Sequence, residues 1–182
     1  RMWEPGGFHR PLPAAQREWK TDTGKARFKV PHGLDEDDDV SPGQDARQVI
    51  QLMTLRSNDQ FNTTIYGYHD RFRGVNGTRR VVFMNRNDVV RLGHAPGDWV
   101  TLRTAVEPDI RREVGPLQII AYDIPDGCAA AYYPECNPLV PLWHHAKRSK
   151  VPAAKSVPVT LHAAVPDPRA QARALPASDQ VI

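Results

Sequence analysis

A run of hydrogen-bonding side chains begins where a nearly continuous apolar segment, residues 49–55, ends. An arginine at the start of the run carries a planar, permanently charged fork that suits phosphate, and three amides offer both a donor and an acceptor to a heteroaromatic edge. A ligand-binding loop and a polar turn with capping side chains are both open at this point. The candidate binding residues of this run are Arg56, Ser57, Asn58, Gln60, Asn62 and Thr63.

A second polar and aromatic stretch covers residues 131–140. Either Tyr132 or Tyr133 could stack on a ligand or donate to it, and Asn137 could bond a ligand edge. A packed aromatic turn explains the same residues equally well. Cys136 would need a neighbouring base to act as a nucleophile, and the sequence does not show that the nearest histidines, at 144 and 145, lie beside it.

A basic segment follows at residues 144–150. Its adjacent histidines point in different directions on a strand, so they would chelate a metal poorly. We favour a basic loop beside an anionic ligand, with a plain solvated loop as the alternative. The acidic run at 35–39 lacks the alternating ligands and central glycine of a calcium loop, so it is predicted to be a solvated linker.

These candidates must be positioned by short strands, because the 17 prolines argue against a helical bundle. A short helix at 89–92 would be capped by Asn87-Asp88 and ended by Gly93. Six or seven short strands favour a mainly β fold, a β-barrel. The predicted strands cover residues 26–30, 49–55, 81–84, 99–104, 109–113, 117–124 and 157–161.

The 182 residues suffice for one domain with a real core. We expect an irregular lead-in and acidic linker with one strand over 1–47, an ordered domain over 48–163 and a disordered Ala/Pro-rich tail over 164–182. The connection at 56–77 exceeds ordinary loop lengths and contains several aromatic residues, so it is predicted to be a folded functional loop.

Composition narrows the function classes. The net charge of +3, from 24 basic and 21 acidic residues, is too mild for a nucleic-acid or membrane surface without clustering. No apolar run approaches the ~18 residues of a membrane span, and no signal peptide is visible. Cys128 and Cys136 form no CxxC pair, so they are predicted to be free thiols in a reducing, cytoplasmic compartment. The opening Arg1-Met2-Trp3 is expected of a piece of a longer protein.

Several short motifs occur in a fixed order along residues 21–162. Together they resemble the C-terminal dinucleotide-binding domain of the molybdopterin oxidoreductases, and most closely the formate-dehydrogenase-like group. The motifs are Thr21 to Phe28; Thr54-Leu55-Arg56; Asp88, Leu92-Gly93 and Gly97-Asp98-Trp99-Val100; Tyr133-Pro134-Glu135-Cys136-Asn137; and Ser149, Pro152 and Lys155.

The resemblance implies a double-psi β-barrel and a bound molybdopterin guanine dinucleotide with molybdenum or tungsten. Carried over by position, its contacts would come from the run beginning at Arg56 and from Asn137 and Lys155. Leu55 stands where many relatives have glycine, and Ala154 where they have an aromatic residue, so close backbone approach and stacking are not predicted there.

The resemblance also places the metal ligand, and an iron–sulfur cluster if there is one, in other domains of a parent enzyme. We therefore expect those domains as partners, a small substrate such as formate, and no activity from the isolated chain. Two alternatives are a barrel that binds proteins without redox activity, and nucleic-acid binding through Lys147, Arg148, Lys150 and the arginine-containing tail. An adjoining P-loop ATPase would favour the first alternative.

Overall fold

The computed structural model describes residues 5–28, 30, 47–58, 60, 67–106, 109–166 and 168. The chain divides into two compact units, Arg1–Asp37 and Asp38–Ile182. In the first unit, η1 (Pro13–Gln16) is a short 3-10 helix that begins at a proline. Residues 26–28 form no strand, and Phe28 and Val30 are each 95% exposed. The predicted strand at 26–30 is therefore wrong for its described residues, since alternation without a partner strand leaves backbone groups unpaired.

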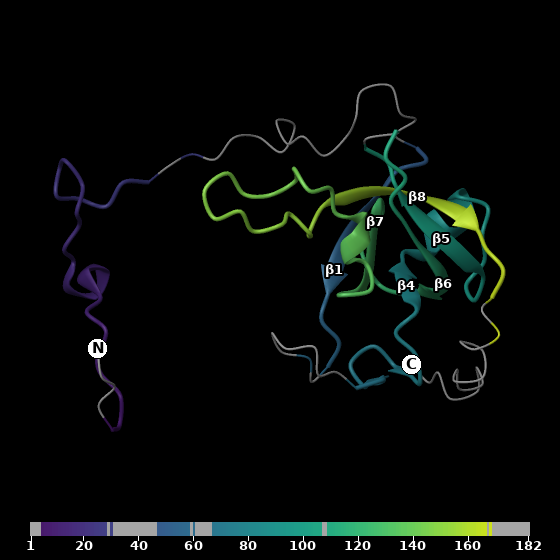
Figure 1. Ribbon diagram of the computed structural model, residues 1–182, viewed down its shortest axis with the longest axis horizontal. Coiled ribbons are helices and arrows are strands. Elements are labelled where there is room, and N and C mark those ends of the chain that lie inside the picture. Colours follow the sequence, from purple (N-terminus) through teal and green to yellow (C-terminus); the bar gives the residue numbers. More distant parts are fainter. Residues whose placement is uncertain are drawn as a thin grey trace. The chain divides into compact units, whose positions relative to one another are not determined.

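Six strands of the second unit close into a barrel in the order β1-β7-β4-β6-β5-β8 (Figure 1). β1 runs parallel to β7 and β4 runs parallel to β6, while the other neighbouring pairs are antiparallel. The prediction of a mainly β, six- to seven-stranded barrel with short helices is confirmed. The barrel strands are β1 (Ile50–Leu55), β4 (Val81–Met84), β5 (Trp99–Thr104), β6 (Glu113–Ala121), β7 (Cys128–Tyr132) and β8 (Val157–Ala163).

The core follows from side-chain alternation on these strands. Ile50 and Leu52 of β1 are fully buried inside the barrel. The next residue, Met53, points to the opposite face and is 43% exposed. All four residues of β4 are buried, because a second apolar cluster covers its outer face. That cluster includes Val75 of a small hairpin formed by β2 (His69–Asp70) and β3 (Val75–Asn76). The connection at 56–77 is thus folded in its described part, as predicted.

Two strands differ from expectation. β6 is one strand where two segments were predicted, and it passes so close to β5 that a Cβ at Gly115 would lie 2.8 Å from the Thr101 Cα. Only glycine permits that approach. β7 was not predicted as a strand, because its three consecutive alanines carry little β propensity. Their small side chains are buried where β7 pairs with β1 and β4.

Strand direction gives the barrel two different ends. At one end, here called the site rim, β1, β5 and β7 finish and β4, β6 and β8 begin; at the other, the cap rim, the reverse holds. The cap rim carries α1 (Arg86–Arg91), which starts earlier than predicted because Asn85, rather than Asn87-Asp88, caps it by accepting from the Asn87 N–H at 2.8 Å. Gly93 ends it with φ +77, in agreement with the prediction.

Asp88 is buried at the cap rim and has a structural role. Its Oδ2 accepts a hydrogen bond from the Gly127 N–H at 2.6 Å, and its Oδ1 pairs with Arg91 at 2.6 Å. These bonds tie the helix to the turn that precedes β7.

In the part of the chain that the structure describes, no helix has the length and apolar character needed to cross a membrane. Cys128 and Cys136 are free thiols, as predicted.

Candidate functional site

The parallel pairing of β1 and β7 brings their two following loops together at the site rim. Leu55 lies opposite Tyr132 in the register, so Arg56 and Tyr133 leave the barrel side by side. The Arg56 Nε donates to the Tyr133 hydroxyl at 3.2 Å, and its guanidinium lies 6.0 Å from the ring centroid. An exposed cation is thereby held beside an aromatic ring.

β8 runs antiparallel to β1, so the segment before β8 also reaches the site rim. The Thr54 N–H donates to the Ala154 carbonyl at 2.9 Å, and the Lys155 Nζ donates to the Thr54 carbonyl. Asn137 follows β7 in the chain and is the first residue of η3 (Asn137–Leu139). The Thr104 hydroxyl anchors this turn through the Leu139 carbonyl at 2.7 Å. The connection after β1 and both ends of the connection between β7 and β8 therefore meet at the site rim.

A projecting arm, residues 141–153, completes the arrangement (Figure 1). The arm doubles back on itself through a bridge between His145 and Pro152 and a hydrogen bond from the Ala146 N–H to the Val151 carbonyl at 2.9 Å. Between the arm and the carboxyl half of β1 lies a pocket of about 910 Å³. Its lining includes Arg56, Asn137 and Lys155, three of the residues singled out from sequence.

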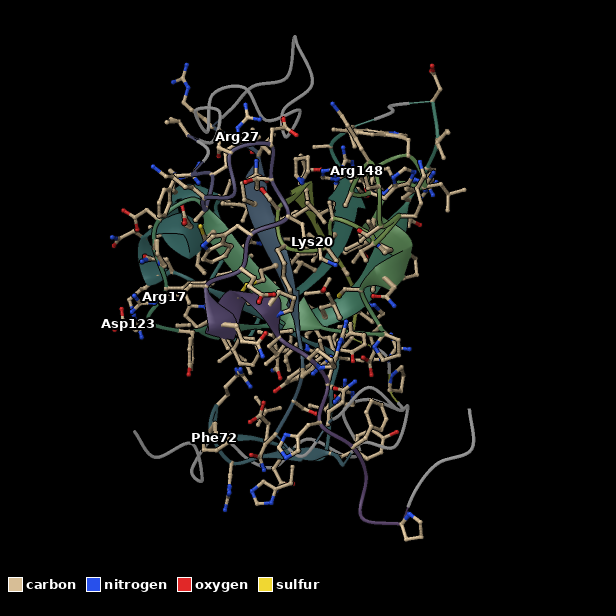
Figure 2. All side chains as sticks on the ribbon, turned by 90° about the vertical axis from the view of Figure 1, so that its left-hand side faces the viewer. Arg17, Lys20, Arg27, Phe72, Asp123 and Arg148 are labelled. Atoms are coloured by element: carbon tan, nitrogen blue, oxygen red, sulfur yellow. The ribbon has the colours of Figure 1, made fainter. Side chains whose placement is uncertain are left out.

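The pocket is lined by cations and, among the residues that the structure describes, by no Asp or Glu. In Figure 2, Phe72, on the hairpin, lies below the barrel strands, and Arg148, on the arm, lies near their upper edge. Lining residues lie close to each of them: Arg73 follows Phe72, and Lys150 is two positions after Arg148. The hairpin and the arm therefore both contribute positive charge. The lining residues that carry or can carry such charge are Arg56, Arg73, His144, His145, Lys150 and Lys155.

The other predicted binding residues lie elsewhere. Ser57, Asn58 and Gln60 are buried and are not part of the pocket lining. Gln60 instead folds its loop, because its Oε1 accepts from the Ser57 N–H at 3.1 Å and its Nε2 donates to the Tyr133 carbonyl at 3.0 Å. Asn62 and Thr63 lie outside the described residues.

Sequence reasoning missed Arg79, which is 3% exposed and lies two residues before β4. Its Nε and Nη2 donate to the Glu135 carboxylate at 2.6 and 3.1 Å, and its Nη1 donates to the Ser57 hydroxyl at 2.6 Å. The available signal was a pair of arginines, Arg79 and Arg80, directly before a wholly apolar strand. The partner of Arg79 stands 56 positions away, however, so the ion pair could not be read from spacing.

A second buried network, around Asp70, adjoins the first. The Tyr132 hydroxyl donates to Asp70 at 2.7 Å, and Arg73 pairs with the same oxygen at 2.6 Å. Burial by itself would raise the pKa of Asp70, but the hydrogen bonds from Tyr132 and Arg73 outweigh it and lower that pKa below its ordinary value. Burial raises the pKa of Tyr132, so its hydroxyl stays protonated as a donor. Tyr132 is therefore a structural donor, whereas Tyr133 faces the pocket.

Nucleophilic and metal chemistry find little support in the described residues. Burial, followed by the nearby Glu135 charge, raises the pKa of the Cys136 thiol to about 12, so the thiolate is not available near neutral pH. Within the same part of the chain, no group of three or more His, Cys, Asp or Glu side chains is arranged to hold a metal ion. The arrangement suits anion binding.

Comparison with known proteins adds an enzyme class. No family model matches the chain. It is 46% identical over 168 residues to an uncharacterized oxidoreductase of Mycobacterium tuberculosis (strain H37Rv) and to one of Mycobacterium bovis, a match covering 86% of this chain and 20% of each relative. It is 40% identical over 164 residues to the protein YdeP of Escherichia coli (strain K12), covering 88% of this chain and 21% of that protein. The chain thus spans about a fifth of the length of the curated relatives it matches, and it corresponds to one part of larger proteins, among them named oxidoreductases.

Proposed function

We propose that this chain is the domain of a molybdopterin-dependent oxidoreductase that binds molybdopterin guanine dinucleotide. One observation carries the proposal: Arg56, from the connection after β1, and Asn137 and Lys155, from opposite ends of the connection between β7 and β8, line one pocket. The described lining of that pocket contains several cations and no carboxylate. The oxidoreductase relatives and the ordered motifs support the same conclusion.

The donor set fits such a ligand. Arg56 and Lys155 supply charge-assisted donors for a diphosphate, and Asn137 supplies a donor and an acceptor for a ring edge. The pocket volume lies in the upper part of the ~300–1,000 Å³ range of small-molecule sites. When bound, the metal–pterin group supplies the redox chemistry. The residues of this chain would bind its anionic part, orient it and shield it from water.

The formate-dehydrogenase-like assignment rests on the motif order alone and is part of the proposal. Formate is its test substrate. In the full-length protein, produced in cells supplied with molybdate or tungstate, formate-dependent reduction of a dye acceptor would support the assignment. Stoichiometric metal without formate turnover would leave the cofactor proposal standing and remove formate as the substrate.

The cofactor proposal is tested by metal content. We expect the full-length protein to contain molybdenum or tungsten and to release guanosine monophosphate on acid hydrolysis. Deletion of residues 48–162 should abolish retention of both. Arg56→Ala should weaken retention about 10- to 100-fold, since a hydrogen bond to a charged group contributes about 1.5–3 kcal/mol.

A matched control is Arg111→Ala, which removes an exposed arginine that pairs with Glu113 away from the pocket lining. It should leave metal content unchanged. Stoichiometric metal after the deletion, or equal losses from Arg56→Ala and Arg111→Ala, would contradict the proposal.

A further inference from the structure

The buried guanidinium of Arg79 connects three segments that converge at the site rim. It bonds Ser57 and Gln60 in the loop after β1, and Tyr133 and Glu135 in the turn after β7. Arg79 itself lies two residues before β4. The donor–acceptor distances lie between 2.6 and 3.1 Å. All three of its nitrogens take part.

The burial of the Arg79 guanidinium must be compensated by favourable interactions. A guanidinium removed from water is costly unless its N–H groups are bonded and its charge is paired. Here the paired carboxylate of Glu135 is 23% exposed, whereas the Arg79 side chain is only 2% exposed. The planar fork also fixes direction, since its donors diverge toward both loops at once; a lysine ammonium lacks that geometry.

Strand pairing holds little of either loop, although the Tyr133 N–H still donates to the Leu55 carbonyl at 3.0 Å. β1 ends at Leu55 and β7 ends at Tyr132. Beyond that register, direct contacts between the loops include the bond from Arg56 to Tyr133 and that from Gln60 to the Tyr133 carbonyl. Arg79 reinforces the second of these, because its Nη2 donates to the same Tyr133 carbonyl at 2.8 Å and to the Gln60 Oε1 at 3.0 Å.

We infer that Arg79 is a positioning residue for the pocket: with Glu135 it holds the loop after β1 against the turn after β7, and so presents Arg56 and Tyr133 to an anionic ligand. The part of this inference that concerns a ligand rests on the proposed function. Arg79 is not among the residues that line the pocket, so it acts through Arg56 and Tyr133.

The test compares two adjacent arginines in the full-length protein. Arg79→Met removes the fork and keeps much of the apolar stem, while Arg80→Met alters an exposed arginine that donates to the Gly115 carbonyl at 3.5 Å. Amide hydrogen exchange is measured at residues 57, 60, 133, 136 and 137, whose N–H groups are hydrogen-bonded. We expect exchange there to rise at least about tenfold in Arg79→Met, as bonded amides gain local opening, and to stay unchanged in Arg80→Met.

Ligand coupling is read with guanosine diphosphate as the probe, in the single variants Arg56→Ala and Arg79→Met and in the double variant. If Arg79 acts through Arg56 and Tyr133, each single variant weakens binding about tenfold or more, and the loss in the double variant is clearly smaller than the product of the two single losses. A loss in the double variant equal to the product of the two single losses would overturn the inference.

The two proposals fail in different ways. A wild-type protein that binds no guanosine diphosphate and retains no metal contradicts the proposed function, yet the exchange measurement still decides whether Arg79 holds the loops. Unchanged exchange in Arg79→Met overturns the positioning role whatever the ligand result. Arg79→Lys adds a further check: faster exchange in this variant is expected, and wild-type exchange would contradict a role for the fork.

Discussion

The two rims of the barrel use buried charge for different purposes. At the cap rim, Asp88 pairs with Arg91, three residues away, and accepts from the turn before β7. At the site rim, Arg79 pairs with Glu135, 56 positions away, and spans two loops. The first arrangement closes a local helix–turn unit. The second aligns two loops that are far apart in the sequence. One residue of each loop, Arg56 and Tyr133, lines the pocket that contains several cationic side chains.

This difference teaches where to expect function. The polar groups of the cap-rim connections bond to partners within the same rim. Long connections at the site rim leave cationic side chains at the surface of the pocket. Mutations should therefore separate into those that change stability alone and those that change binding alone.

The largest effect on stability is expected from Asp88→Ala at the cap rim. It would leave the Gly127 N–H without its acceptor and Arg91 without its partner, at a cost of about 2–3 kcal/mol in the free energy of unfolding. Urea unfolding measures the loss. Guanosine diphosphate affinity below the unfolding transition should match the wild type, and a weakened affinity would break the separation of the rims.

Lys155→Met at the site rim should do the opposite. It removes a cation from the pocket lining and retains most of the apolar stem, so affinity for guanosine diphosphate should fall about tenfold, or about 1.4 kcal/mol. Titration calorimetry measures the affinity, and Lys155→Arg serves as the charge-retaining control. An unfolding temperature lowered as much as in Asp88→Ala would count against the comparison.

Tyr132→Phe addresses the buried network behind the pocket. Losing the hydroxyl donor to Asp70 should cost about 1–1.5 kcal/mol of stability at neutral pH. The pKa of Asp70 is lower in the folded protein than its ordinary value, so the stability that this group contributes is present above the unfolded-state pKa of about 3.9 and is lost as the pH falls through the folded value. The gap between variant and wild type should narrow below about pH 4 in denaturant titrations. A gap that widens in acid would exclude the hydrogen bond as its cause.

The smallest effect is expected from Asp98→Ala. Its exposed carboxylate accepts from the Ala95 N–H at 2.8 Å in a cap-rim turn, so the cost should be about 0.5–1 kcal/mol. Asp123→Ala, another exposed position in the connection between β6 and β7, is the control (Figure 2). Equal unfolding temperatures for the two variants would show that the turn bond contributes nothing measurable.

The local hydrophobic pattern of the sequence predicted several of the barrel strands. Apolar runs at Val81–Met84 and alternation at Val100 and Leu102 marked strands that the structure contains. The alanine-rich strand β7 was not predicted, because its alanines are buried by neighbouring strands and have little β propensity of their own. The strand expected at 26–30 showed the reverse error: alternation was present, but no packing surface accompanies it in the described residues.

The candidate site was predictable where chemistry and loop position coincide. Arg56, Asn137 and Lys155 were chosen as polar residues in the motifs that carry the resemblance, and they share a pocket. Ser57 and Gln60 had the same polar character, yet their partners are internal. Only three-dimensional pairing tells a ligand-facing donor from one that braces a loop. For the same reason Arg79 could not be found from sequence.

The parallel register of β1 and β7 has a consequence for how this region tolerates changes in chain length. Because Leu55 faces Tyr132, the first residues beyond each strand emerge as a matched pair. Adding or deleting a single residue within either strand would offset the pair and turn alternate side chains to the opposite face. Insertions at the tip of the arm, around Arg148, would shift nothing in that alignment. Natural length variation should therefore concentrate in the arm and be absent from the two strands.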